Sequence, residues 1–314
     1  MFLLIICRDN DRNKRFSIFH ILYYIISYFM QIKHKNNTGQ FFSVIIPTLN
    51  EEKYLPKILK SLANQTYRDF ELILIDGHSI DGTIKVFDKF KDKFPKALAL
   101  ESEKRNVSYQ RNLGGKKASG EYLVFLDADV DVCETFLEEI HLAAVKQNFI
   151  LATTWIMPDS NKPIDRLMLT LANLNLELAK VINKPFTGGY NTIVKRDFFL
   201  RLKGFREDLF VSEDHDFAIR ASKVGVLPVI LKEPYVIWSL RRFRSEGHLE
   251  VFRKYAKASV HTLLHGPITK ALFDYPMGGH AHIKKKKRLD LTKLNTYFSA
   301  MRKLEDKIVK LLEE

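Results

Sequence analysis

Cysteine is scarce in this sequence, with only Cys7 and Cys133 among 314 residues. The two lie far apart and show no metal-ligand spacing, so the sequence supports neither a disulfide framework nor a zinc site. Internal repeats are also absent, which excludes a solenoid or a propeller. These absences favour a protein of a reducing compartment with its own core, for which 46% hydrophobic residues are sufficient.

Acidic residues are fewer than basic residues, with 37 Asp and Glu compared with 50 Lys and Arg. The formal net charge of +13 points first to anionic partners, namely nucleotides, phospholipid headgroups or nucleic acid.

Long apolar runs are also few, and the longest extends from Phe16 to Ile32. Its length is at the lower edge of what spans a bilayer, and no small-residue cleavage site follows it, so a removed signal peptide is not expected. Three interpretations stay open: a marginal membrane anchor, a helix lying on the membrane, or residues upstream of a true start at Met30. We expect some membrane association, and we assign residues 1–40 to this hydrophobic segment and its linker.

Strand and helix signals alternate from Phe42 to Gln147, which predicts a parallel α/β sheet with right-handed crossovers. Acids directly follow two of the predicted strands, namely Asp76 after residues 71–75, and Asp127, Asp129 and Asp131 after residues 122–126. Because ligands of such sheets bind beyond the carboxyl ends of the strands, these acids lie where a ligand would be. For an isolated Asp-Ala-Asp, a solvated loop that caps the next helix is the alternative.

The second half of the chain continues the same pattern. It predicts strands at residues 151–157, 226–230 and 235–238, an apolar helix at 164–182, a helix after Ser212, and an amphipathic helix at 291–312. The apolar stripe of the 164–182 helix is either ordinary core or a wall for a lipid-linked acceptor. The basic run from Lys284 to Arg288 is either a solvated face or a contact with an anionic leaflet.

Five motifs in this order resemble the large inverting glycosyltransferase family with the GT-A fold, in particular family 2-like enzymes such as dolichyl-phosphate sugar synthases and bacterial polysaccharide glycosyltransferases. The motifs are PTLNE (Pro47–Glu51), IDGHSIDGT (Ile75–Thr83), RN (Arg111–Asn112), the strand with DAD (Gly120–Asp129) and SEDHD (Ser212–Asp216). The chain departs from the family pattern at Gly77 and His78. The resemblance implies a Rossmann-like, mainly parallel sheet flanked by helices at residues 41–247, followed by a helical basic extension at 248–314.

The resemblance also implies roles for individual residues. The donor site would comprise Pro47, Glu51, Asp76, Ser79, Arg111, Asp127, Arg241 and Arg242, with Asp76 on the nucleobase and the two late arginines over the phosphates. Asp129, with Asp127, would hold Mn²⁺ or Mg²⁺ on the diphosphate, where carboxylates are suitable ligands. Asp214 would be the general base, and Glu213 would position the acceptor or the base.

The sequence therefore predicts an inverting, metal-assisted glycosyltransferase that moves one sugar from a nucleotide-diphosphate sugar, preferably UDP-linked, to a lipid-linked or glycan acceptor. We expect it at the cytoplasmic face of a membrane in cell-envelope polysaccharide synthesis, or in the cytoplasm if the chain starts at Met30. Two alternatives stay open. A sugar-phosphate nucleotidyltransferase would usually show a Gly-rich signature near the first strand. A basic membrane-binding or nucleic-acid-binding module would leave the acids without a purpose, and the acids would repel a nucleic acid.

Overall fold

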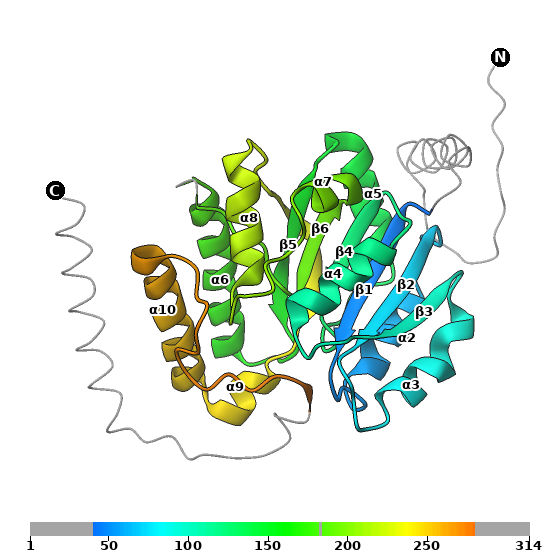
Figure 1. Ribbon diagram of the computed structural model, residues 1–314, viewed down its shortest axis with the longest axis horizontal. Coiled ribbons are helices and arrows are strands. Elements are labelled where there is room, and N and C mark those ends of the chain that lie inside the picture. The colour runs from blue at the N-terminus through cyan, green and yellow to red at the C-terminus, as the bar shows by residue number, and fades with distance from the viewer. Residues whose placement is uncertain (1–39, 182–183, 280–314) are drawn as a thin grey trace, which may run out of the picture.

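The computed structural model describes residues 40–181 and 184–279. A seven-stranded sheet in the order β3-β2-β1-β4-β6-β5-β7 forms the centre of this described part (Figure 1). The strands are β1 (Phe42–Thr48), β2 (Phe70–Asp76), β3 (Ala97–Glu101), β4 (Tyr122–Leu126), β5 (Leu151–Pro158), β6 (Asn191–Lys195) and β7 (Val229–Trp238). Strand β6 runs antiparallel to β4 and β5, and the other neighbours are parallel. The expected mainly parallel α/β sheet is confirmed.

Helices cover both faces of this sheet. They are α2 (Leu55–Ala63), α3 (Thr83–Phe90), α4 (Val107–Lys117), α5 (Phe136–Gln147), α6 (Pro163–Val181), α7 (Arg196–Arg201), α8 (Glu213–Lys223), α9 (Arg241–Glu246) and α10 (His248–His265), with a short 3-10 helix, η1 (Lys91–Lys93). Side chains of α2, α3 and α5 pack on one face of the sheet, and those of α7 and α8 pack on the other. The expected arrangement of flanking helices is therefore confirmed.

Strand β1 shows why the central strands read as continuous apolar runs. Val44 and Ile46 belong to the core beneath α2 and α5, whereas Ile45 belongs to the core beneath α7 and α8. A strand that is buried on both faces has mostly apolar residues in succession, so alternation disappears from its sequence, and its buried Ser43 and Thr48 hydroxyls are hydrogen-bonded to acids of β2.

Helix α4 packs unusually close to the sheet because two glycines face its neighbours. A Cβ atom at Gly114 would lie 2.5 Å from Ile45, and one at Gly115 would lie 2.5 Å from Phe199. From this close position, the Gln110 amide donates hydrogen bonds to the carbonyls of Thr48 (2.9 Å) and Ile75 (2.8 Å). The helix thus ties together the carboxyl ends of β1 and β2, where the acids begin.

The two closing strands expected at residues 226–230 and 235–238 are in fact the single strand β7. It pairs with β5 on both sides of a register shift between Thr154 and Ile156, so the residues around Pro234 are accommodated as an irregularity within one strand. A proline has no backbone N–H and weakens the strand signal locally, which explains the error.

The last described segment, residues 266–279, folds back towards the sheet. Ile268 packs with Val211 and Ala258 in a small third core, and the backbone N–H of Gly279 donates to the Leu49 carbonyl at 3.1 Å. The apolar run at 16–32, the basic run at 284–288 and the helix expected at 291–312 lie outside the described residues. Among the helices that the structure describes, none combines the length and the apolar character needed to cross a bilayer.

Candidate active site

Two arginines gather the acids that follow the central strands. Arg111, from α4, forms ion pairs with Asp127 (2.7 Å) and Glu213 (2.5 Å), and we call these three residues the Arg111 cluster. Arg241, from α9, forms ion pairs with Glu51 and Asp129, and we call these three the Arg241 cluster. Each cluster joins parts of the chain that are far apart in the sequence.

Arg111 is the more deeply buried of the two arginines. The Arg111 side chain is 3% exposed, and it also donates a hydrogen bond to the Gly189 carbonyl at 2.7 Å. Burial raises the pKa of the Asp127 carboxyl to about 6, although the Arg111 charge opposes this. Burial, followed by the charge of Asp214, raises the pKa of Glu213. At both carboxylates, removal from water therefore raises the pKa by more than the ion pair with Arg111 lowers it.

Asp214 lies beside this cluster at the start of α8. A Cβ atom at Gly189 would lie 3.2 Å from Asp214 Oδ2 and 3.3 Å from Arg111 Nη2, so the missing side chain lets the backbone approach both groups. Asp214 Oδ1 accepts a hydrogen bond from the backbone N–H of His215 at 2.8 Å. The structure thus brings Glu213 and Asp214 to the end of β4, next to Asp127. Ser212 precedes the helix as expected, but its hydroxyl makes no capping hydrogen bond there.

The Arg241 cluster lies at the rim of the same site. Arg241 donates from both Nη atoms to the Glu51 carboxylate (2.5 and 2.8 Å), and its Nε lies 2.7 Å from Asp129 Oδ2. Its guanidinium stacks over the Tyr54 ring at 4.5 Å. Burial raises the pKa of Asp129 to about 6, and Arg241 opposes this shift. Burial also raises the pKa of Glu51.

The expected nucleoside end is a network of turns after β1 and β2. Asp76 accepts hydrogen bonds from the Thr48 hydroxyl (2.9 Å), the Ser79 hydroxyl (2.6 Å) and the Ser79 N–H (2.8 Å). Pro47 pairs with Ile75 just before these turns. The Asn50 N–H in turn donates to the Ser79 hydroxyl at 2.7 Å, so the two loops are fixed to each other.

Arg242 contacts a different part of the chain from Arg241, which pairs with Glu51 and Asp129. The Arg242 guanidinium stacks on the Tyr275 ring at 3.7 Å and donates to the Pro276 carbonyl at 3.3 Å. Gly279 lies close enough to Glu51 that a Cβ atom there would be 2.7 Å from Glu51 Oε2. No local sequence pattern indicated that this late segment borders the site, and the same is true of Tyr54.

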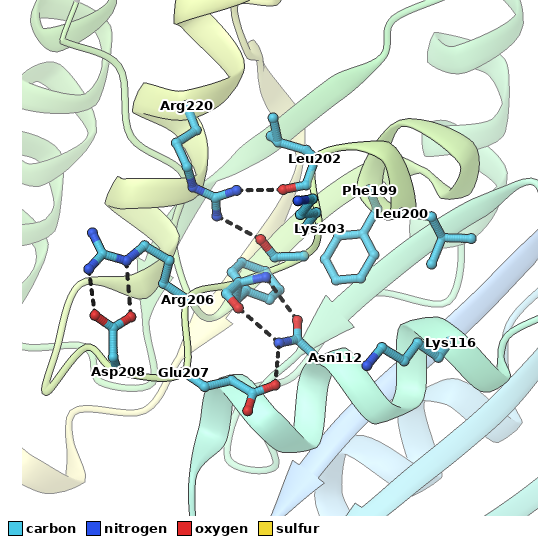
Figure 2. Close-up of a pocket in the computed structure, with 12 residues that line it drawn as sticks. Asn112, Lys116, Phe199, Leu200, Leu202, Lys203, Arg206, Glu207, Asp208 and Arg220 are labelled. Carbon is cyan, nitrogen blue, oxygen red and sulfur yellow. Dashed lines mark hydrogen bonds and ion pairs between the residues drawn. The ribbon is translucent and has the colours of Figure 1, made fainter.

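A separate cavity of about 780 Å³ lies on the other side of the RN motif. Asn112 is hydrogen-bonded to the backbone of Phe205 and to the Glu207 side chain, and Arg220 donates to the carbonyls of Leu202 and Gly204. Figure 2 shows Asn112 with Glu207 and Arg220 with Leu202 at this cavity. None of the acids of the two clusters lines this cavity. Arg111 and its neighbour Asn112 therefore have different tasks, because Arg111 holds the acids and Asn112 holds the loop before α8.

The acids suit a divalent ion that arrives with a phosphate ligand. Within residues 40–181 and 184–279, no group of three or more His, Cys, Asp or Glu side chains is arranged to hold a metal by itself. Mg²⁺ sites commonly use one or two carboxylates and complete the shell with water and substrate phosphates. Asp129, with Asp127 nearby, provides such a partial set, so these residues fit an ion shared with a diphosphate.

Three known glycosyltransferases illustrate what the chain is similar to. It is 38% identical over 91 residues to the poly(ribitol-phosphate) beta-N-acetylglucosaminyltransferase TarS of Staphylococcus aureus, a match of 28% of this chain and only 16% of TarS. It is 34% identical over 203 residues to the cholesterol galactosyltransferase of Borreliella burgdorferi, covering 58% of this chain and 56% of that one. The chain thus matches only part of the length of these relatives.

Solved structures show the same fold. The crystal structure of TarS residues 1–349 with UDP-GlcNAc superposes with a TM-score of 0.53 at 22% identity, over 63% of this chain and 58% of that one. The mannosyltransferase PcManGT of Pyrobaculum calidifontis, in complex with GDP-Man and Mn²⁺, gives 0.55 at 19% identity, over 77% and 73%. The family model described as glycosyl transferase family 2 matches residues 43–202, just over half of the chain. The chain therefore belongs to glycosyl transferase family 2.

Proposed function

We propose that this protein transfers one sugar, with inversion, from a nucleotide-diphosphate sugar to a lipid-linked or glycan acceptor at the cytoplasmic face of a membrane. The observation that carries the proposal is the placement of Asp214 beside the Arg111 cluster, a short distance from the acids at the end of β4. A base and a set of cation-binding carboxylates are then present in one site. The names of the relatives support a nucleotide-sugar donor, and the cholesterol galactosyltransferase supports a lipid acceptor.

In this proposal the Asp214 carboxylate accepts the proton of the acceptor hydroxyl as the hydroxyl attacks the anomeric carbon. The bond from that carbon to the diphosphate breaks, and the nucleoside diphosphate leaves on the opposite face. Arg111 keeps Glu213 and Asp127 in place around the reacting sugar. Glu51, Asp76, Ser79 and Pro47 would form the nucleoside end, and Arg241 would meet the phosphates, whereas Arg242 would have to leave Tyr275 to do so.

The ion that Asp129 and Asp127 would hold is Mn²⁺ or Mg²⁺, which stabilises the charge that develops on the leaving diphosphate. A UDP-linked donor is our first expectation. Without a cation, Glu51 and Asp129 would repel the donor phosphates. The arginines and the ion would both reduce this repulsion by neutralising negative charge.

The proposal is tested by measuring nucleoside diphosphate release from a panel of nucleotide sugars, with and without Mn²⁺. Asp214→Asn should lower turnover by about 10²–10⁴-fold while donor binding persists, since only the proton acceptor is lost. Asp216→Asn is the matched control on the same helix, because Asp216 pairs with Arg220 at 2.7 Å instead of entering the cluster. Full turnover by the Asp214 variant would overturn the assignment of the base.

A further inference from the structure

Helix α6 exposes a row of aliphatic side chains to solvent. The α6 stripe consists of Ile164, Leu167, Leu171, Leu174, Leu178 and Val181, which are 48–77% exposed. Their spacing alternates between three and four residues, so they share one face of the helix. The buried residues of the same helix, including Leu169, Asn173 and Leu176, form another face that packs towards β5. The helix is therefore apolar on two sides, and the fold explains only one of them.

The sequence left open whether the apolar stripe of this helix is core or a wall for a lipid-linked acceptor. In the structure one face of the helix is core and another apolar face is exposed. Side chains at 169 and 176 are core. Leu171, Leu174 and Leu178 were expected on one stripe with Met168, but Met168 is partly buried against the core while the other three are exposed. An exposed apolar row of this length is unusual on a protein surface and marks an interaction site.

The charged residues of α6 and its flanking segments that are exposed are all cations. The two acids of α6 are turned to protein partners: Asp165 accepts from the Ser160 hydroxyl at 2.6 Å and pairs with His248 at 2.9 Å, and Glu177 accepts from Trp155 Nε1 at 3.2 Å. Lys162 and Arg166 are exposed near the start of the helix, and Lys184 is exposed just beyond its end. The stripe is thus an apolar row bordered at both ends by cations.

A bilayer fits this pattern better than a second copy of the chain. A stable protein interface takes roughly 20–30 residues from each partner, whereas the stripe has six half-exposed side chains. A membrane surface requires no complementary shape, and its anionic headgroups match the cations at the ends of the helix. With 19 residues, α6 is about 28 Å long and could lie along the surface over its whole length.

A short segment of chain connects the C-terminal end of α6 to the surroundings of the proposed base, Asp214. The connection after α6 leads to Phe186, whose ring lies 4.5 Å from the ring of His215, and then to Gly189, which adjoins Asp214. The two helices pack into different cores, α6 through Leu169 and α8 through Phe217, so this connection is what links the stripe to the proposed base. The C-terminal end of α6 is therefore only eight residues along the chain from the glycine that adjoins Asp214, and an acceptor anchored at that end of the stripe would lie on the side of this connection.

We propose that the α6 stripe docks on the surface of an anionic bilayer and holds the enzyme over its lipid-linked acceptor, an inference that rests on the proposed function for the identity of that acceptor.

The test places a reporter on the stripe in the full chain. Cys7 and Cys133 are replaced by Ser, and Leu171→Cys is labelled with an environment-sensitive fluorophore. Leu98→Cys is the matched control, because Leu98 is also an exposed leucine (40%) but lies on β3, at the opposite edge of the sheet. Vesicles of phosphatidylcholine with phosphatidylglycerol should shift the emission at position 171 to the blue and protect it from a water-soluble quencher, while position 98 does not change.

Two further results separate the possible outcomes. Replacing Leu171 and Leu174 together by Gln should weaken vesicle binding by about tenfold or more. Asp214→Asn should bind vesicles as well as the parent protein does, so a failure of the catalytic proposal would not imitate a failure of docking. A probe at 171 that stays in water while the protein sediments with vesicles would overturn the proposal. A shift without vesicles that grows with protein concentration would also overturn it, because the occupant would then be a second copy.

Discussion

The Arg111 and Arg241 clusters have the same composition but different settings. In each, one guanidinium bridges two carboxylates from separate elements. Arg111 belongs to a helix that packs directly on the sheet, and its side chain is 3% exposed, whereas Arg241 belongs to a short helix at the rim and is 13% exposed. The comparison suggests that one cation is part of the framework and that the other can exchange with a ligand.

Their further contacts strengthen this contrast. Arg111 is held by a third acceptor, the Gly189 carbonyl, so its removal would take a donor away from three groups at once. Arg241 instead stacks on Tyr54, and one of its two carboxylates, Asp129, is a proposed ligand of the divalent ion. The Arg241 guanidinium can neutralise Glu51 and Asp129 until another cation takes its place.

The largest effect is expected from Arg111→Ala. Breaking a buried ion pair by removing one partner leaves an uncompensated charge, which costs about 3–5 kcal/mol. We expect a loss of that size in the free energy of unfolding, measured by urea denaturation. Arg111→Lys should recover part of it, because a lysine keeps the charge but cannot form the same set of hydrogen bonds. A loss of less than about 1 kcal/mol would mean that Arg111 is not part of the framework.

The sequence predicted the Arg111 cluster better than the Arg241 cluster, for a physical reason. The strand ends, the acids after β4 and the helix that begins at Glu213 all have strong local signals, and the carboxyl ends of neighbouring strands in a sheet meet at one edge. The parallel sheet was predicted correctly on the same basis. Arg111 was expected in the nucleotide pocket, and the structure places it among the acids themselves.

The pairing of Arg241 with Glu51 spans 190 residues, and no local pattern encodes it. It depends on how α9 follows β7, which the sequence had divided into two strands. The return of residues 266–279 to Leu49 depends on tertiary packing in the same way. The outer face of α6 was visible only as an apolar stripe, since periodicity shows that a face is apolar but not what covers it.

Arg241→Ala should have a smaller effect on stability, and the effect should depend on ions. We expect a loss of about 1–2 kcal/mol without divalent ions, between the values for exposed and buried pairs. Mn²⁺ should then stabilise the variant more than the parent, because Asp129, one of the two proposed ligands, no longer has a competing guanidinium. At about 100 times its dissociation constant, a bound ion adds about 2.7 kcal/mol.

Thermal unfolding with and without Mn²⁺ measures this difference directly and requires no turnover. Donor affinity should fall in the same variant, since the phosphates lose one cationic partner. If Mn²⁺ stabilised parent and variant equally, Arg241 would not compete for the site, and the two clusters would be more alike than their settings suggest.

The smallest effect is expected from Arg244→Ala, which is the matched control on the same helix. Arg244 also forms a two-point pair, with Asp159 at 2.7 and 2.8 Å, but its side chain is 48% exposed. Exposed pairs contribute about 0.2–1 kcal/mol, and Asp159 would keep the backbone N–H of Leu240 as a donor. Stability should therefore change by less than about 1 kcal/mol, and neither the response to Mn²⁺ nor donor affinity should change. A response like that of Arg241→Ala would show that loosening α9, rather than freeing Glu51 and Asp129, causes the effect.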